Sequence, residues 1–163
     1  MISSEHDPSP GAPLGDWLAA DLSSVDREVT PWLLVGIHRP LVESELYPSD
    51  AAVAAGLRAI LEPLLLRWHV DVVLAGHYHS FQRSCAMAAL QCVPKGGIVH
   101  YTTGAAGSNL DASDACCANT TYIERTITGA YGFSVLTANA SALRLAWYFN
   151  DNGTLGDDAW LRR

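Results

Sequence analysis

Three histidines stand where their side chains could bind one metal ion. His38 follows one apolar run, and His77 and His79 follow another in the sequence Gly76-His77-Tyr78-His79. In an extended segment, residues i and i+2 project to the same side, so we expect His77 and His79 to face one point. Three neutral imidazoles that converge there would form a metal site. Gly76 favours this interpretation, because a residue without a side chain lets the backbone turn sharply beside a bound ion.

Two short buried strands and the helix between them must position these histidines. Residues 32–37 and 70–75 are apolar runs of strand length, and residues 51–68 are an alanine- and leucine-rich helical segment with Ser49-Asp50 as the expected N-cap. A strand, helix and strand in this order join parallel strands, and their carboxyl ends lie at one edge of the sheet. We therefore expect the three histidines to meet at that edge, although a single strand-end histidine is more often a hydrogen-bonded edge residue.

The other segments predict a mixed α/β chain with antiparallel strands at its C-terminal end. Residues 14–25 carry apolar side chains at helical spacing, and the acidic residues of 41–50 indicate a surface loop. Beyond residue 96 we expect a long loop at 104–121 and short strands at 98–103, 132–137, 143–149 and 159–161. The chain thus divides into a β-α-β part with the histidines, 1–95, and a β-rich part, 96–163.

Composition excludes several classes of protein. The 163 residues are 49% apolar and 17% charged, which is typical of one globular unit. The net charge is −7 and no segment gathers the 10 cations, so nucleic-acid binding is not expected. The longest apolar runs are about six residues, against roughly 20 for a membrane span. No basic start or apolar stretch marks a signal peptide in this sequence.

Other features point to an extracellular protein. Three acceptor tripeptides for N-glycosylation, none with a central proline, lie within the last 45 residues, at Asn119, Asn139 and Asn152. The four cysteines are Cys85, Cys92, Cys116 and Cys117. They allow three pairings, of which Cys85 with Cys92 is the natural short closure, or they are reduced thiols in a cytosolic protein. We expect a secreted or extracellular parent protein.

The two histidine segments resemble the last two of the five metal-binding motifs of the purple acid phosphatases, which are calcineurin-like metallophosphoesterases. These segments are residues 32–40, with Val-x-x-His followed by Arg-Pro, and residues 76–85, Gly-His-Tyr-His-Ser-Phe-Gln-Arg-Ser-Cys. The likeness extends in order over nearly the whole chain, and the spacing of Cys85 and Cys92 is also similar to the family's. It implies half of an α/β/β/α sandwich, the C-terminal half of the family's catalytic domain.

The resemblance also implies a set of ligands. His38 and His77 would bind a divalent metal, zinc, manganese or iron, and His79 would bind Fe(III). The family's other ligands lie in the motifs Gly-Asp-x-Gly, Gly-Asp-x-x-Tyr and Gly-Asn-His-Asp/Glu, which this chain lacks, so three of seven ligands are present. The partner implied for this chain is therefore a missing N-terminal half of the catalytic domain, which would supply the carboxylates and phenolate that offset the charge of two ions.

The implied activity is that of an acid phosphatase, which hydrolyses phosphate monoesters at a dinuclear Fe(III)–M(II) centre. Arg39 would contact the phosphate, or it pairs with a nearby carboxylate. After the first motif the chain has Glu43, Glu45 and Tyr47 where some members carry substrate-facing histidines. We expect the isolated chain to be inactive. The alternatives are a mononuclear zinc hydrolase that uses the three histidines, and a truncated, non-catalytic module.

Overall fold

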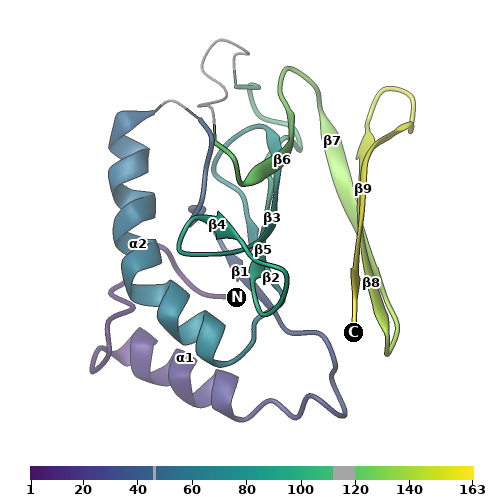
Figure 1. The fold of residues 1–163 in the computed structure, drawn as a ribbon. Coiled ribbons are helices and arrows are strands. Elements are labelled where there is room, and N and C mark those ends of the chain that lie inside the picture. The colour runs from purple at the N-terminus through teal and green to yellow at the C-terminus, as the bar shows by residue number, and fades with distance from the viewer. Residues whose placement is uncertain (46, 112–119) are drawn as a thin grey trace.

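The computed structural model describes residues 1–45, 47–111 and 120–163 (Figure 1). Its helices are α1, Pro13–Ser23, and α2, Pro48–Arg67. Its strands are β1, Leu34–Ile37; β2, Val72–Ala75; β3, Phe81–Ala88; β4, Gln91–Cys92; β5, Ile98–Thr103; β6, Ile123–Ile127; β7, Gly132–Ala138; β8, Ala142–Phe149; and β9, Leu155–Arg162. Among these described residues, no helix has the length and apolar character that a membrane span requires.

The strands form two sheets. The larger sheet has the order β1-β2-β5-β3-β4, with β6 paired to β3; β1, β2 and β5 are parallel, and β3 is antiparallel to β5. The smaller sheet is the antiparallel meander β7-β8-β9. Figure 1 shows both helices on one side of the larger sheet and the smaller sheet on its other side. The mixed α/β class, the β-α-β crossover and the C-terminal antiparallel strands are confirmed.

The crossover places two strand ends side by side. β1 and β2 pair in parallel with Leu34 opposite Val72 and Ile37 opposite Ala75. The pairing continues for one hydrogen bond, from the Gly76 N–H to the His38 carbonyl at 3.1 Å. The segments that carry the histidines therefore leave the sheet at the same edge, as the crossover rule predicts.

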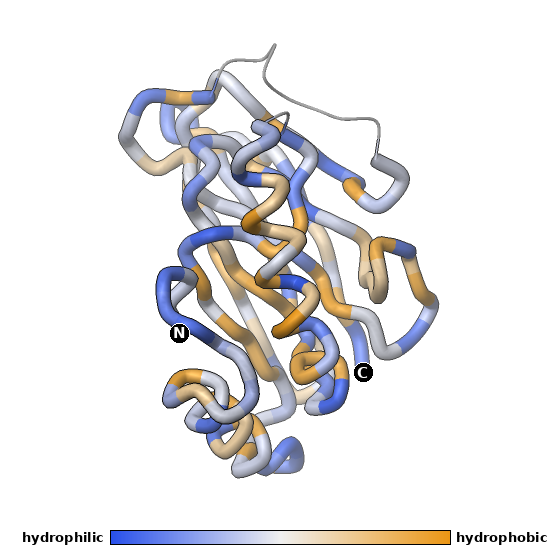
Figure 2. The backbone as a smooth tube through the Cα atoms, turned by 90° about the vertical axis from the view of Figure 1, so that its left-hand side faces the viewer, coloured by the Kyte–Doolittle hydropathy of each residue, from blue (hydrophilic) through white to orange (hydrophobic). Residues whose placement is uncertain are grey.

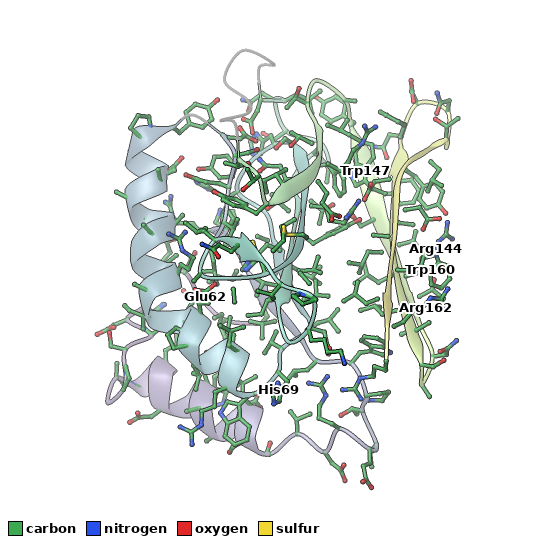
Figure 3. All side chains as sticks on the ribbon, in the orientation of Figure 1. Glu62, His69, Arg144, Trp147, Trp160 and Arg162 are labelled. Atoms are coloured by element: carbon green, nitrogen blue, oxygen red, sulfur yellow. A yellow bond between two sulfur atoms is a disulfide. The ribbon has the colours of Figure 1, made fainter. Side chains whose placement is uncertain are left out.

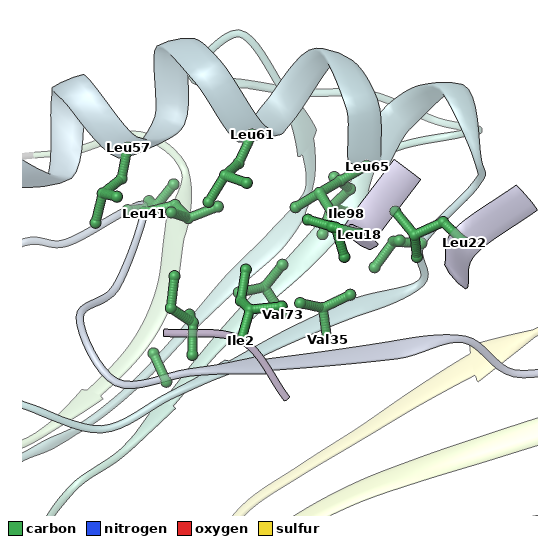
Figure 4. Packing of buried hydrophobic residues seen from close by; sticks show 14 of the residues in the cluster. Ile2, Leu18, Leu22, Val35, Leu41, Leu57, Leu61, Leu65, Val73 and Ile98 are labelled. Carbon is green, nitrogen blue, oxygen red and sulfur yellow. The ribbon is translucent and has the colours of Figure 1, made fainter. Parts of the chain in front are cut away.

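Leucines on one face of α2 form the core against the larger sheet. Leu57, Leu61 and Leu65 recur every four residues, so they share a face, and each is at most 8% exposed. Figure 4 shows them over Val35 of β1 and Val73 of β2. Figure 2 shows that apolar residues also predominate in the strands behind α2. This packing holds the helix of the crossover against both strands that end at the histidines.

A second core fills the space between the two sheets. Trp147 of β8 is fully buried, with ring centroids 5.3 Å from Phe81 and 4.9 Å from Phe149. Glycines make room for its indole: a Cβ on Gly132 would lie 1.9 Å from the ring, and one on Gly156 would lie 2.7 Å from it. Figure 3 shows Trp147 directed toward the larger sheet, whereas Trp160, Arg144 and Arg162 lie on the outer side of the smaller sheet.

Three sequence-based expectations about local structure were wrong. α2 begins at Pro48 after Tyr47, and neither Ser49 nor Asp50 is its N-cap. The strands β3, β4 and β6 were missed, because the buried polar residues of β3 hide the alternation that marks a strand. Residues 41–45 are not a surface loop, since most of them are buried. The long loop expected at 104–121 lies partly outside the described residues. Cys116, Cys117 and Asn119 belong to the part that is not described.

Candidate metal centre

His38 and His77 lie in contact at the shared edge of β1 and β2. Their ring centroids are 5.2 Å apart and the rings are nearly perpendicular, at 78°. His38 is exposed and His77 is half-buried. The strand register accounts for this pairing, because each histidine leaves the sheet just beyond the matched residues Ile37 and Ala75.

His77 adopts a left-handed backbone conformation. Its φ is 66°, which for a residue other than glycine costs on the order of 1 kcal/mol or more and is common at functional sites. The glycine before it is not required by sterics: a Cβ on Gly76 would meet the His38 Nδ1 at 3.7 Å, an ordinary contact distance. The sharp turn that we expected from Gly76 is therefore made at His77.

His79 does not join the other two histidines at one point. Its Nδ1 lies 2.5 Å from the Asn109 carbonyl oxygen, and the Asp111 N–H donates to the His79 carbonyl at 3.3 Å. The reason is the left-handed residue at 77: the segment is not extended, so the i and i+2 side chains need not share a side. In the part of the chain that the structure describes, no group of three or more His, Cys, Asp and Glu residues could hold a metal ion.

Arg39 is the charged residue closest to the histidine pair. Its Nη1 lies 3.2 Å from the His77 Nε2, and its Nε donates to the Glu5 carboxylate at 2.8 Å. Asp50 also approaches, with Oδ1 at 3.4 Å from the arginine and Oδ2 at 3.5 Å from the His77 Nε2. The hydrogen bond to Glu5 raises the pKa of Arg39, so this side chain stays cationic. Arg39 is thus paired with carboxylates, the simpler of its two expected roles.

A buried polar network follows His38 in the chain. Ser44 and Glu45 are 2% and 4% exposed, and they bond to Ser80 and Gln82, which are 0% and 2% exposed. Burial is the main cause that raises the pKa of Glu45 to about 7; the Ser80 hydroxyl opposes this rise and the Asp111 carboxyl adds to it. We did not predict this network, and the only signal in the sequence is the polar composition of 43–45 directly after the motif.

Glu43 adds a second link to the histidine turn. It accepts a hydrogen bond from the Tyr78 hydroxyl. Burial raises the pKa of Glu43, and burial together with this hydrogen bond raises the pKa of Tyr78, so the phenol stays protonated.

Glu43 and Glu45 also line a cavity of about 400 Å³ next to Arg58 and Tyr122. Another cavity, of about 740 Å³, opens between the two sheets and is lined by none of the three motif histidines.

The remaining histidines have structural or exposed positions, as expected. His6 is exposed and its Nδ1 lies 2.8 Å from the Ser3 hydroxyl. His69 is left-handed, with φ 53°, just after α2 ends. His100 is 5% exposed, and burial lowers its pKa to about 3, so its imidazole is neutral.

The disulfide and two of the three glycosylation acceptors are described. Cys85 of β3 and Cys92 of β4 form a disulfide, which confirms the short closure. Asn139 and Asn152 are exposed in the turns β7–β8 and β8–β9.

The sequence of this chain is similar to known phosphatases. Residues 97–158 match the family described as "Iron/zinc purple acid phosphatase-like protein C". The chain is 32% identical to "Probable inactive purple acid phosphatase 9" of Arabidopsis thaliana, over 96% of this chain and 26% of that protein. It is 33% identical to an acid phosphatase of Aspergillus ficuum, over 89% of this chain and 26% of that protein.

A solved structure shows the same fold. The purple acid phosphatase PPD1 from yellow lupin (Lupinus luteus) seeds superposes with a TM-score of 0.89 and 27% identity, over 99% of this chain and 30% of that chain. The chain thus spans about a quarter to a third of the length of these proteins. The fold seen here corresponds to one region of a larger molecule in each case.

Proposed function

Since this chain has the sequence and fold of the C-terminal region of the purple acid phosphatases, we propose that it supplies three ligands to a dinuclear centre that hydrolyses phosphate monoesters. His38 and His77 would hold the divalent ion, zinc, manganese or iron, and His79 would hold Fe(III). When bound, the two ions would polarise the ester and supply a hydroxide nucleophile. This chain's own part is to hold three imidazoles at the strand ends and to keep Arg39 beside them.

The contact between His38 and His77 carries this proposal. Two imidazoles on one tetrahedral ion, at Zn–N distances of about 2 Å, have ring centres about 5 Å apart. The observed separation of the ring centroids is 5.2 Å, which supports the assignment of both rings to one ion. Arg39 lies against the same His77 nitrogen, and it would have to turn aside when an ion binds. A phosphate held at the pair would then lie within reach of its guanidinium.

The other ligands would come from a further part of the protein. The aspartates of the two Gly-Asp sequences in this chain have other partners. The Asp16 carboxylate accepts a hydrogen bond from the Gly11 N–H, and Asp157 is paired with Arg83 of β3. Three neutral imidazoles cannot offset the charge of two metal ions. Because the relatives are three to four times as long as this chain, we propose that it is a part of a longer catalytic domain.

Zinc binding by the purified chain tests the histidine pair. Loss of a residue that only supports a metal ligand typically weakens metal affinity by roughly 10- to 100-fold. Because His77 would be a ligand itself, we expect His77→Ala to weaken Zn²⁺ affinity by more than that. A competition titration with a chromophoric chelator measures this, and His6→Ala is the control because His6 contacts only Ser3 among the partners described. Equal affinities of wild type and His77→Ala would overturn the proposal. Turnover of a chromogenic phosphate ester by the chain loaded with iron and zinc would contradict the need for further ligands.

A non-catalytic module is the second candidate, because one of the similar Arabidopsis proteins is named as probably inactive. In that case the chain keeps the fold but does not take part in a catalytic metal centre. The zinc titration separates the two functions, since a module without a centre has no reason to bind the ion through His38 and His77. A mononuclear zinc site on the three histidines is the remaining alternative; it would need His79 to bind the same ion through its Nε2, because its Nδ1 lies at the Asn109 carbonyl oxygen.

We also propose that the protein is secreted and carries N-linked glycans at Asn139 and Asn152. In each acceptor the asparagine Oδ1 accepts from the backbone N–H and the hydroxyl of the residue two positions on, Ser141 at 2.9 and 3.2 Å and Thr154 at 2.9 and 2.6 Å. The asparagine NH₂ groups thus stay available on exposed turns. Asn119, the third proposed acceptor, lies outside the described residues.

Mass spectrometry of the protein from its own source tests the glycans. We expect peptides with Asn139 and Asn152 to carry sugar that an amidase removes, leaving aspartate at both positions. In a eukaryotic secretory host, Thr154→Ala should lose one glycan, because the acceptor requires the hydroxyl, whereas Thr154→Ser should keep it. Unmodified peptides at both positions in secreted protein would refute this prediction.

A further inference from the structure

The segment that follows His38 is held in the interior rather than on the surface. Leu41 and Val42 are 1% and 2% exposed, and Figure 4 shows Leu41 next to Leu57 of α2. The Arg58 guanidinium donates to the Leu41 carbonyl at 2.9 Å, which ties the segment to the helix. The two residues that follow Glu43 are polar, and they are buried as completely as the apolar ones.

Four buried polar side chains, Ser44, Glu45, Ser80 and Gln82, join this segment to the start of β3; we call them the polar bracket. The Ser44 N–H and hydroxyl both donate to the Gln82 Oε1 at 3.0 Å. The Gln82 Nε2 donates to the Glu45 Oε1 at 2.8 Å, and the Ser80 hydroxyl donates to the same oxygen. Every oxygen and nitrogen of the Gln82 amide is therefore engaged inside the protein.

The polar bracket lies where strand pairing has stopped. Pairing of β1 with β2 ends at Ile37 and Ala75, and one further hydrogen bond joins the Gly76 N–H to the His38 carbonyl. Beyond that point the two segments diverge, one toward Ser44 and the other through the left-handed His77 into β3. The bracket joins them, because Ser44 and Glu45 belong to the His38 segment and Ser80 and Gln82 to the His77 segment; the hydrogen bond from the Tyr78 hydroxyl to Glu43 also joins them.

Buried polar groups of this kind fix one arrangement. Removing one partner leaves another buried donor or acceptor without a bond, at a cost of about 1–3 kcal/mol, so the segments cannot slide past each other freely. An apolar contact is non-directional and would tolerate such a shift. Strand pairing thus fixes the separation of the two segments before the histidines, and the hydrogen bonds of the polar bracket fix it after them.

We propose that Glu45 and Gln82 are positioning residues that set the separation of His38 and His77, and thereby the affinity of that pair for a divalent ion. The inference rests on the proposed function for its zinc readout. The hydrogen bonds of Glu45 and Gln82 go to Ser44, Ser80 and each other, so we infer that these residues act through the backbone of the two segments.

The test compares Glu45→Leu and Gln82→Met with Glu45→Gln. Glutamine at 45 keeps the acceptor oxygen that Ser80 and Gln82 use, so we expect Glu45→Gln to bind Zn²⁺ within about twofold of wild type. Glu45→Leu and Gln82→Met remove bracket hydrogen bonds and are expected to weaken Zn²⁺ binding by roughly 10- to 100-fold, the range for partners outside the first coordination shell. Val99→Ala, a truncation in the core between the sheets, is the stability control: it should lower the melting temperature without changing zinc affinity.

A second readout needs no metal. In the metal-free wild type, NMR should show a nuclear Overhauser effect between ring protons of His38 and His77, and it should weaken in Glu45→Leu and Gln82→Met but persist in Val99→Ala. All measurements are made below the melting temperature of every variant, checked by circular dichroism. If Glu45→Leu does not fold, the Zn²⁺ affinity and the ring contact of Gln82→Met alone test the positioning role.

The outcomes separate this inference from the proposed function. A wild type that does not bind Zn²⁺ but shows the ring contact, lost in Gln82→Met, overturns the metal function and supports the positioning role. A wild type that binds Zn²⁺ while Gln82→Met binds equally and keeps the ring contact overturns the positioning role alone.

Discussion

Replacing Trp147 with alanine is expected to lower the free energy of unfolding by about 3 to 5 kcal/mol. Trp147 is fully buried between the sheets and stacks against Phe81 of β3. Its truncation removes apolar burial and leaves a cavity that cannot collapse, because the glycines that face the indole, Gly132 and Gly156, have no side chains to move into the space. Since small domains have about 5–15 kcal/mol in total, this variant should be close to unfolding.

Urea denaturation followed by circular dichroism measures the loss. Trp160→Ala is the matched control, because Trp160 is 52% exposed on the outer side of the smaller sheet, where its ring faces Arg144 and Arg162 in cation–π contacts. We expect that control to lose about 1 kcal/mol at most. Trp147→Phe, which keeps an aromatic ring, should fall between the two. A loss below about 1 kcal/mol for Trp147→Ala would mean that the sheets do not depend on this contact.

Raising the pH is expected to destabilise the protein through Glu45. Burial raises the pKa of this carboxyl from the ordinary 4.5 to about 7, so the folded state holds its proton more tightly than the unfolded state does. The resulting stabilisation is fully present below about pH 4.5 and is lost as the pH rises through 7. Since one pKa unit is worth about 1.4 kcal/mol, this rise corresponds to a stabilisation on the order of a few kcal/mol, which Glu45 shares with the neighbouring Asp111 carboxyl.

Glu45→Gln isolates this contribution, because an amide does not titrate between pH 4 and 8. We expect stability to fall between about pH 5 and 8 in wild type more steeply than in Glu45→Gln, measured by urea unfolding at each pH. Glu43, whose pKa burial also raises, remains in both proteins and contributes the same slope to each. Glu28→Gln is the control on an exposed carboxylate and should follow wild type. Parallel curves for wild type and Glu45→Gln would refute a proton held at Glu45.

Local patterns in the sequence were enough to predict the strands and the helix that carry the proposed metal ligands. Two apolar runs of strand length with a helix between them predicted β1, α2 and β2, and the parallel-strand rule placed His38 and His77 at one edge. Motif residues predicted the family, and the seven-residue separation of Cys85 and Cys92 indicated the disulfide. These features are local or follow from a topological rule, so they do not require knowledge of the packing.

Only the tertiary structure decided how the segments beyond the strands are arranged. The backbone at His77 is left-handed, and the turn that it makes directs His79 toward Asn109. A sequence signals a left-handed residue mainly by glycine, so a histidine in this conformation could not be predicted. The hydrogen bonds by which the polar bracket joins the two segments link residues that are 35 to 38 positions apart, so the sequence near one residue does not identify its partner. For the same reason β3 was missed: its buried Ser and Gln interrupt the apolar alternation, and burial becomes favourable only once distant partners satisfy their hydrogen bonds.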